Sequence, residues 1–468
     1  MNRNNFLPHI ALALVLILVA AFAGQLRRWQ KQWKSQVRII PAEKKHPATI
    51  DEIALTDSLH LGRPEILVRF KPGVSEETID RITSQLNDRV EDRIENAPGL
   101  DAIDDLDNED AIELVAQYSK MPEVEYAEEN YEISLPDAVE GPLVPVLPHD
   151  PQFADQWALS NEGQRGGKKG ADISAPLAWA TTTGSDKVVV AVLDSGVDYN
   201  HADLVNNMWV RPANLPPYHD DDLGIIDDVN GFDAIDNSSD PMDDNGHGTH
   251  CAGIIGAEGS NDIGIAGVDW KVQIMPLKFM NAGGFGTTKD AIEAINYVIE
   301  RKKAGVNVRI ISASWGSTQK SRALEDIIRK AYEEGILFVA AAGNSSTNND
   351  RAPHFPSSYN VPNVVSVAAL DRNDQLASFS NYGPKSVAIA APGVDILSTW
   401  LGNEYEEKSG TSMATPVVAG VAALVLAHEP GLTVDELKKK LLTSVDKLDS
   451  LNGKVTSGGR INAAKAVE

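Results

Sequence analysis

Three short segments, far apart in the sequence, carry side chains that together can catalyse acyl transfer. Asp194 ends an apolar run, His247 opens a segment of small residues, and Ser412 precedes a long apolar stretch. Serine is a weak nucleophile at its ordinary pKa, so it needs a base such as histidine, which in turn needs a carboxylate to orient it. The chain therefore holds a nucleophile, a base and an orienting carboxylate.

Each of these residues also has an ordinary structural interpretation. A serine ahead of a helix is usually an N-cap, a histidine among apolar residues is often a hydrogen-bonded core residue, and an aspartate after a strand can cap the next turn. The presence of all three in one chain favours catalysis over these interpretations.

Attack on a carbonyl also requires hydrogen-bond donors for the negatively charged oxygen. A helix that starts at Ser412 offers unpaired N–H groups and a partial positive charge. The side-chain amide of Asn344, which follows three alanines and glycine, is a second candidate donor. Taken alone, Asn344 would be interpreted as a turn residue.

Two neighbours of His247 suggest other chemistries. His250 follows three residues later, but no glutamate lies between the two, as it does in the helical zinc motif of metalloproteases. Cys251 is the only cysteine of 468 residues, so it forms no intramolecular disulfide, and the complete serine set leaves it no nucleophilic role. We expect both residues to be buried and structural.

The three segments resemble the signature blocks of the subtilisin-like serine proteases, in particular the thermitase-like branch. These blocks are Asp-Ser-Gly at 194–196, His-Gly-Thr-His at 247–250 and Gly-Thr-Ser-Met-Ala-Thr-Pro at 410–416, in the family's order. The resemblance spans residues 150–468. It implies a serine endopeptidase in which Asp194, His247 and Ser412 form the catalytic triad and Asn344 completes the oxyanion hole.

The same resemblance implies a peptide-binding cleft. Two segments resemble the family's substrate-pairing strands, and a third resembles the wall of the pocket for the side chain before the scissile bond; they contain Gly284, Phe285, Gly286, Ser314, Trp315, Gly316, Ala342 and Gly343. Backbone pairing would hold an extended peptide, and pockets would set specificity. His354 stands where the family often has glycine or asparagine, which leaves the pocket's preference open.

Calcium binding is implied in two places. Gln152, Asp203 and Asn261 match the family's strong calcium site, and Asp233, Asp236 and Asp240 resemble the calcium loop of thermitase-like members. Oxygen ligands suit Ca²⁺, so we expect it as a cofactor. The alternatives are a capping role for Asp203 and a solvated acidic loop at 233–240. Met242 stands where some relatives have an oxygen ligand.

Strands and helices alternate over residues 149–468, the expected catalytic domain. Apolar runs at 308–313, 337–342 and 364–369 alternate with amphipathic segments at 288–302 and 321–334. This alternation predicts an α/β fold, a doubly wound, mostly parallel sheet with helices on both faces. Such a sheet brings the ends of its strands, and with them the catalytic groups, to one edge.

A second, smaller domain precedes it. Residues 61–135 show strand patterns at 65–70 and 124–131 and helical patterns at 76–86 and 110–119. This α+β pattern resembles the ferredoxin-like inhibitory propeptide of subtilases. Residues 136–148 are rich in proline, leucine and valine and form the expected processing linker. The resemblance implies a zymogen cut between Tyr131 and Asp150, with its own propeptide as a partner.

The N-terminus carries an export or anchoring segment. Residues 1–24 have a small basic start, an apolar stretch and a small-x-small site, which favour a signal peptide, with an uncleaved membrane anchor as the alternative. Residues 25–60 are a polar spacer. A cleaved signal peptide would place the enzyme outside the cytoplasm, as a secreted, periplasmic or cell-surface protein, and membrane contact is expected only if the segment is not cleaved. For an uncleaved anchor the basic residues Arg27, Arg28, Lys31 and Lys34 would favour the opposite orientation, so the sequence leaves the orientation open.

Composition narrows the possible functions. The net charge of −25 argues against nucleic-acid binding, and 42% hydrophobic residues provide an ample core. We therefore expect a monomeric exported endopeptidase acting on proteins or peptides. The alternative is a membrane-tethered processing or binding protein that acts on one partner, although the intact catalytic set argues against an inactive relative.

Overall fold

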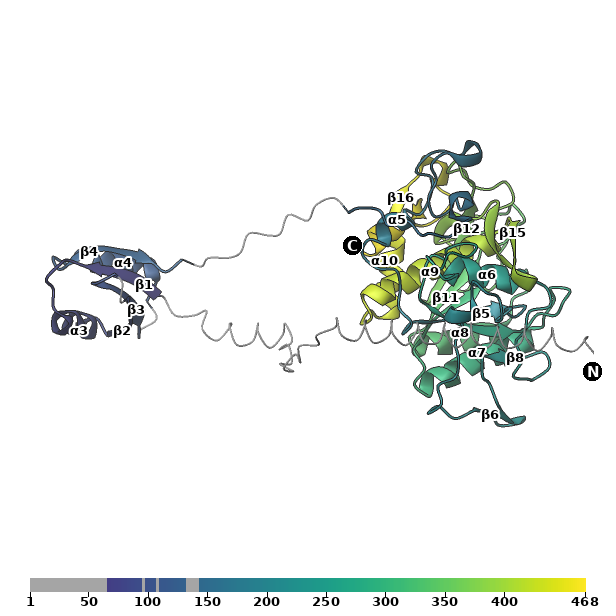
Figure 1. Ribbon diagram of the computed structural model, residues 1–468, viewed down its shortest axis with the longest axis horizontal. Helices are drawn as coiled ribbons and strands as arrows, with labels where there is room; N and C mark the ends of the chain where they lie inside the picture. Colours follow the sequence, from purple (N-terminus) through teal and green to yellow (C-terminus); the bar gives the residue numbers. More distant parts are fainter. Residues whose placement is uncertain (1–64, 95–96, 107–108, 132–142) are drawn as a thin grey trace, which may run out of the picture. The chain divides into compact units, whose positions relative to one another are not determined.

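A computed structural model describes residues 65–94, 97–106, 109–131 and 143–468 (Figure 1). The chain divides into two compact units, Met1–Ala138 and Val139–Glu468. The expected signal or anchor segment, the polar spacer and residues 132–142 lie outside the described residues.

The N-terminal unit is a four-stranded antiparallel sheet with two helices. In chain order its elements are β1 (Glu65–Phe70), α3 (Glu76–Gln85), β2 (Asp88–Arg93), β3 (Leu100–Asp105), α4 (Ala111–Tyr118) and β4 (Val124–Glu129). The strands lie in the order β2-β3-β1-β4. Alternate residues of β1 are buried against Leu114 and Tyr118 of α4. This is the predicted α+β domain, with a ferredoxin-like order of strands and helices.

The C-terminal unit is built on a nine-stranded sheet in the order β16-β17-β13-β12-β11-β10-β5-β9-β8, parallel except for β16. Its strands are β8 (Phe232–Asp233), β9 (Gln273–Lys278), β5 (Val189–Asp194), β10 (Val308–Ala313), β11 (Leu337–Ala341), β12 (Val364–Leu370), β13 (Ile389–Pro392), β17 (Gly459–Ile461) and β16 (Val445–Lys447). The predicted doubly wound, mostly parallel sheet is confirmed.

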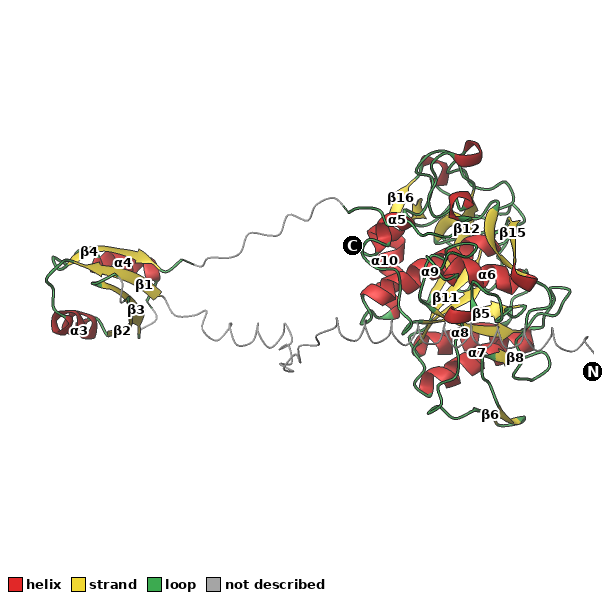
Figure 2. Ribbon diagram, in the orientation of Figure 1, coloured by secondary structure: helices red, strands yellow, loops and turns green. Residues whose placement is uncertain are grey.

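Helices cover both faces of this sheet (Figure 2). They are α5 (Ala175–Ala178), α6 (His247–Gly256), α7 (Thr288–Lys303), α8 (Arg322–Glu333), α9 (Thr411–His428), α10 (Val434–Thr443) and α11 (Ala463–Ala466). Side chains of β5 alternate between the two faces: Val190 and Val192 pack with α6 and α9, whereas Val189, Ala191 and Leu193 pack with α7 and α8. Period-two alternation thus joins one strand to both helical layers.

Helix starts follow ordinary capping chemistry on the α7 and α8 side. The hydroxyl of Thr287 accepts a hydrogen bond from Asp290 N at 3.2 Å, and that of Ser321 accepts one from Leu324 N at 3.2 Å. Each cap satisfies a backbone donor that the first turn leaves free. The two helices that carry the catalytic candidates, α6 and α9, instead begin after Gly246 and Gly410.

Helix α9 runs through the middle of the core. It is the one described helix that is long and apolar enough to cross a membrane, but 83% of its most apolar stretch is buried inside the unit. It contacts β10, β11, β12 and β13 as well as α6. An all-round apolar helix of this kind is a core helix, and Ser412 is the partly buried second residue at its N-terminal end.

Two hairpins extend beyond the main sheet. β6 (Tyr218–Asp220) pairs with β7 (Gly224–Ile226), and β14 (Ile396–Trp400) pairs with β15 (Glu404–Lys408). The β14–β15 hairpin packs on α6, where Ser398 and Thr399 donate to the backbone oxygens of His250 and Thr249. It therefore supports the helix that begins with His247.

Candidate active site

The parallel strands end at one edge of the sheet, and the predicted catalytic residues lie there. Asp194 is the last residue of β5 and is 1% exposed. Its Oδ1 accepts hydrogen bonds from Ser195 N at 2.8 Å and from His247 Nδ1 at 2.7 Å. The contact fixes the imidazole with Nδ1 toward the carboxylate, so that Nε2 is the nitrogen free to act as a base.

His247 is the first residue of α6, and its position depends on the glycine before it. Gly246 has φ of 100°, and a Cβ there would lie 2.5 Å from the ring of Trp400. Only glycine fits this left-handed, crowded turn. Burial by itself would lower the pKa of His247, but the charge and hydrogen bond of Asp194 outweigh it and raise the pKa. The pair therefore favours an imidazole that readily takes up a proton.

Ser412 is the second residue of α9, and its hydroxyl donates to the backbone oxygen of Ser314 at 2.9 Å. Cys251 lies close to Ser412 and to the Asp194–His247 pair. Its Sγ is 3.5 Å from Ser412 O and within 4.8 Å of a carboxylate oxygen of Asp194 and a ring nitrogen of His247. The three predicted triad residues thus surround one cysteine. The Ser412 hydroxyl must turn from Ser314 toward His247 to give up its proton.

Pro416 explains how the first turn of α9 is held. Proline has no N–H, so the backbone oxygen of Ser412, four residues earlier, lacks its helical donor. The hydroxyl of Ser314 at 2.8 Å and the thiol of Cys251 at 3.5 Å donate to it instead. Burial, helped by the charge of Asp194, raises the pKa of Cys251 well above its ordinary value. Cys251 is thus a buried thiol and not a nucleophile.

His250 is also structural. It is fully buried, and its Nε2 contacts the backbone oxygen of Glu406 at 2.9 Å. Burial lowers its pKa to about 4, so the ring is neutral near pH 7. The residue fastens α6 to the β14–β15 hairpin.

Two predicted oxyanion donors converge beside the nucleophile. Asn344 Oδ1 accepts from Thr411 N and Thr411 Oγ1, both at 2.9 Å, which leaves its Nδ2 to donate elsewhere. A Cβ built on Gly410 would lie 3.5 Å from Asn344 Nδ2 and 3.5 Å from Ser412 N. The space that a side chain at Gly410 would fill is therefore flanked by both donors, which suits a substrate oxygen.

Comparison with known families shows to which protein family this chain belongs. The subtilase family model matches residues 185–459, and a model of the fervidolysin N-terminal prodomain matches residues 56–130. The chain belongs to the subtilase family of serine proteases. It is a serine protease made with an N-terminal prodomain.

Similar proteins agree with this assignment. A thermophilic serine proteinase of Bacillus sp. strain AK1 is 33% identical over 430 residues, which cover 90% of this chain and 92% of that protein. Thermitase of Thermoactinomyces vulgaris is 36% identical over 321 residues, or 69% of this chain and 99% of thermitase. A solved protease structure from Pseudoalteromonas arctica is 30% identical, with a TM-score of 0.57, over 68% of this chain and 98% of that one.

The predicted substrate segments of this subtilase lie at the same sheet edge. Trp315, just beyond β10, donates from Nε1 to the backbone oxygen of Leu193 at 2.9 Å and packs on Phe279, with ring centroids 4.8 Å apart. A Cβ on Gly286 would lie 2.1 Å from Phe279 O. Phe279 therefore contacts both segments. Phe285, next to Gly286 in the first of these segments, is 75% exposed, so its ring is available to a ligand.

His354 fills the space between two predicted pocket residues. A Cβ on Gly316 would lie 2.1 Å from His354 Cε1, and one on Gly343 would lie 3.0 Å from His354 Cδ2. Burial lowers the pKa of His354, so its ring is neutral near pH 7. Ala342, the other predicted wall residue, is buried and accepts hydrogen bonds at its backbone oxygen from Asn349 and Asn381.

The residues of the first predicted calcium site lie together. Asp203 is fully buried, and its carboxylate accepts from Asn261 Nδ2 at 2.8 Å and from Tyr405 at 3.2 Å. Gln152 N donates to Gly264 O at 2.8 Å in the same region. Burial raises the pKa of Asp203 to about 6, and the charge of Asp150 contributes to the rise.

Asp150 is a further acidic residue at this site. It is 5% exposed, and its two carboxylate oxygens accept from Ser260 N at 2.8 Å and Asn261 N at 3.1 Å. Its position beside a proline just after the linker gave no signal of its role. Two buried carboxylates close enough to repel each other have the negative charge that a Ca²⁺ ion would neutralise, while the Asn261 amide turns its Nδ2 toward Asp203.

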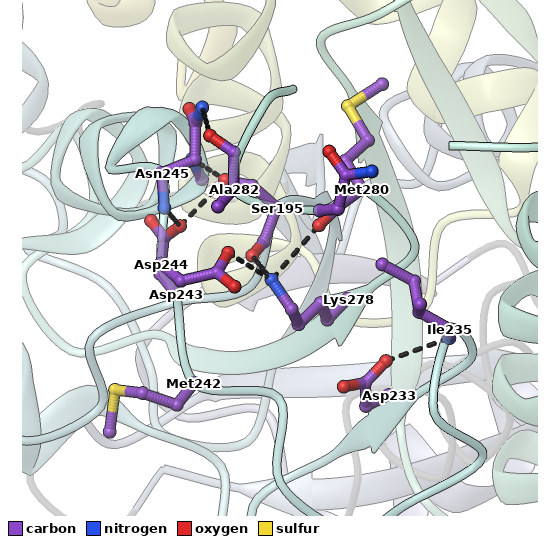
Figure 3. A network of polar contacts seen from close by, with 12 residues as sticks. Ser195, Asp233, Ile235, Met242, Asp243, Asp244, Asn245, Lys278, Met280 and Ala282 are labelled. Atoms are coloured by element: carbon purple, nitrogen blue, oxygen red, sulfur yellow. Dashed lines mark hydrogen bonds and ion pairs between the residues drawn. The ribbon is translucent and has the colours of Figure 1, made fainter. Parts of the chain in front are cut away.

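The second predicted calcium loop is arranged differently. Asp233 Oδ1 accepts from Ile235 N at 2.8 Å (Figure 3), and Asp240 Oδ1 accepts from Tyr199 at 2.8 Å. Among the described residues, the set of three acidic, histidine or cysteine side chains gathered within 4.8 Å is the one around Cys251. Asp233, Asp236 and Asp240 are therefore not gathered into a preformed site, and calcium binding there stays a prediction.

Proposed function

We propose that Ser412 is the nucleophile of this protease, His247 its general base and acid, and Asp194 the carboxylate that orients the imidazole. His247 takes the Ser412 proton as the hydroxyl attacks the peptide carbonyl, and returns it to the leaving amine; water then hydrolyses the acyl-enzyme by the same route. Asn344 Nδ2 and Ser412 N donate to the oxyanion. The 2.7 Å contact between His247 Nδ1 and buried Asp194 carries this proposal.

A covalent label tests the assignment of the nucleophile. A serine-directed fluorophosphonate should add one label to the mature enzyme, and peptide mapping should place it on Ser412. The Ser412→Ala chain should take up none. A label on another serine, or undiminished proteolysis by Ser412→Ala, would show that the nucleophile lies elsewhere.

We further propose that the protease releases its own prodomain by cutting the linker at 136–148. Described linker residues support this, because Val144 is 77% and Leu147 is 59% exposed. The contact of Val146 N with Pro176 O at 2.8 Å ties the end of the linker to the catalytic unit. Ser412→Ala expressed alone should keep residues 61–135 attached. Its normal maturation would show that another protease makes the cut.

Calcium at Asp203, Asn261, Gln152 and Asp150 completes the proposal. A bound Ca²⁺ would neutralise the two buried carboxylates and tie together three segments that are distant in the sequence. Its role is stability, since none of these residues contacts the triad in the structure described here. The ion should therefore raise the melting temperature of the mature enzyme without taking part in the chemistry.

Export and substrate range belong to the same proposal. The apolar segment before residue 25 would direct the chain out of the cytoplasm, where a monomeric enzyme would act on proteins and peptides. Mass spectrometry of the mature protein would show both N-terminal cuts. An intact segment 1–24 on the active enzyme would favour the membrane-tethered alternative.

A further inference from the structure

Lys278, the last residue of β9, places a buried ammonium group between three segments of the active site (Figure 3). Its Nζ donates to Ser195 O at 2.8 Å, to Met280 O at 3.0 Å and to Asp244 Oδ1 at 2.6 Å. Its side chain is 8% exposed. An ammonium has three N–H donors, and all three are used here.

The first segment carries the triad carboxylate. Ser195 follows Asp194 and donates its backbone N–H to Asp194 Oδ1 at 2.8 Å. The Ser195 hydroxyl donates to Asp243 Oδ1 at 2.9 Å and accepts from Gly248 N at 3.0 Å. By holding the backbone oxygen of Ser195, the ammonium restrains the carboxylate that orients the imidazole.

The second segment leads into α6 and its first residue, His247. Asp243 is buried and accepts from Gly246 N at 3.0 Å and from Thr249 Oγ1 at 2.6 Å, so it anchors the start of the helix. Asp244, next to it, forms the ion pair with Lys278. The segments that carry the base and the carboxylate of the triad therefore both contact the same ammonium.

The third segment carries predicted substrate residues. Met280 lies four residues before Gly284, and its neighbour Phe279 donates its N–H to Asp194 O at 3.0 Å. Asn245 Nδ2 donates to Ala282 O at 2.9 Å, which joins this segment to the loop before α6 (Figure 3). The ammonium thus contacts the backbone four residues before the glycines on which an extended peptide would pair.

We propose that Lys278 is a positioning residue for catalysis, whose ammonium holds Asp194, the loop before His247 and the 280–286 segment in their relative places. The proposal rests on the triad roles proposed above. Burying an ammonium group costs free energy unless each of its N–H donors has an acceptor. The three acceptors of Lys278 must therefore stay in fixed positions around it. A neutral side chain of similar length would leave two backbone oxygens and the Asp244 carboxylate without this donor.

Other charges face the ammonium and enter any test of pH dependence. Asp244 pairs with it directly, and Asp243 is the next residue along the same loop. Burial raises the pKa of Asp233, and the charge of Lys278 acts against that rise. Replacing Lys278 therefore also changes the electrostatic field at these carboxylates. A matched control is needed to distinguish effects at the active site from a general loss of stability.

Lys278→Met is the main variant, and Lys438→Met is the matched control. Lys438 lies on α10 and donates to two backbone oxygens, Pro362 O at 2.8 Å and Val364 O at 2.9 Å. Both variants are made in the full chain, matured with a trace of wild-type enzyme, and assayed per active site counted by fluorophosphonate labelling. We expect kcat of Lys278→Met to fall about tenfold to a hundredfold, as for a misplacement of about 1 Å. Lys438→Met should stay within about twofold of wild type, as expected for a control outside the site.

A pH profile separates positioning from simple stabilisation. Since Asp194 raises the pKa of His247, a looser pair should move the acid limb of kcat/KM to lower pH in Lys278→Met. If Lys278→Met fails to fold, Asp244→Asn removes one contact and should give the same shift to a smaller extent. Unchanged kcat and acid limb in the folded variant, with a lower melting temperature alone, would make Lys278 a structural anchor only. Failure of wild type to label at Ser412 would instead overturn the triad assignment.

Discussion

Replacing Asn344 by leucine tests whether its amide stabilises the oxyanion. Leucine has the same branching and the same number of side-chain heavy atoms as asparagine but has no donor, so the variant leaves Ser412 N as the remaining candidate beside Gly410. Loss of one such donor costs about 3–4 kcal/mol of transition-state stabilisation. At about 1.4 kcal/mol per factor of ten, kcat should fall about 10²–10³-fold while KM changes little.

The same substitution also breaks a structural contact, which needs its own control. Asn344 Oδ1 accepts from both Thr411 N and Thr411 Oγ1 at the start of α9. Thr411→Val removes the hydroxyl contact, along with the donation of Gly343 N to that hydroxyl at 3.1 Å, but keeps the Asn344 amide. If donation to the oxyanion dominates, kcat of Thr411→Val should fall by less than about tenfold, the size of a lost neutral hydrogen bond.

The assay is hydrolysis of a peptide p-nitroanilide by matured enzyme, with active sites counted by fluorophosphonate. Variants too slow to process themselves are matured by a trace of wild type, which is then removed through an affinity tag. A large rise in KM at unchanged kcat would make Asn344 a substrate-binding residue. Equal losses in Asn344→Leu and Thr411→Val would show that the Asn344–Thr411 contact, and not donation, is what matters.

Two further predictions concern stability in the inactive Ser412→Ala background, which avoids self-digestion. EDTA should lower the melting temperature of the mature domain, because an ion at one hundred times its Kd stabilises the native state by about 2.7 kcal/mol. Asp203→Ala should abolish most of that difference. Identical melting curves with and without calcium would show that Asp203 binds no calcium. Asp269 is fully buried, its Oδ2 has no hydrogen-bond partner in the described structure, and burial raises its pKa to about 8. Its folded pKa exceeds its unfolded pKa, so this group's contribution to stability is present below about pH 4 and is lost as pH rises toward 8. Asp269→Asn should therefore reduce the fall of the unfolding free energy between about pH 4 and pH 8. At pH 8 the variant should be more stable than its parent by at most about 5 kcal/mol. Denaturant titrations that show an equally steep fall with pH in both proteins would contradict this prediction.

The sequence predicted the parts of the fold whose signals are local. Apolar spacing predicts a strand at 65–70 and a helix at 288–302, and the structure gives β1 (Glu65–Phe70) and α7 (Thr288–Lys303). The β6–β7 hairpin was not foreseen, because its three-residue strands are too short for a periodic pattern. Tertiary contacts hold it in place: buried Asp228 accepts from Tyr218 N at 2.8 Å and Tyr297 at 2.6 Å.

The candidate site was predictable where residue type and motif coincide. Asp194, His247 and Ser412 stand in recognisable blocks, and the structure brings the first two into contact. Lys278 and Asp150 had no such signal. A lysine at a strand end and an aspartate before a proline are common, and their importance lies in partners 83 and 110 positions away, such as Ser195 and Ser260. Contacts between residues so far apart in the sequence cannot be predicted from the spacing of neighbouring residues.

Pro416 removes one backbone hydrogen bond between the turn that carries Ser412 and the next turn of α9. The Ser412 carbonyl is bound by Ser314, just beyond β10, and by Cys251 of α6, instead of by a donor of the next turn of α9. Small substitutions at these two contacts should shift Ser412 while leaving the helix intact. Adjusting the nucleophile's aim in an engineered variant should therefore begin at Ser314 and Cys251, not within α9 itself.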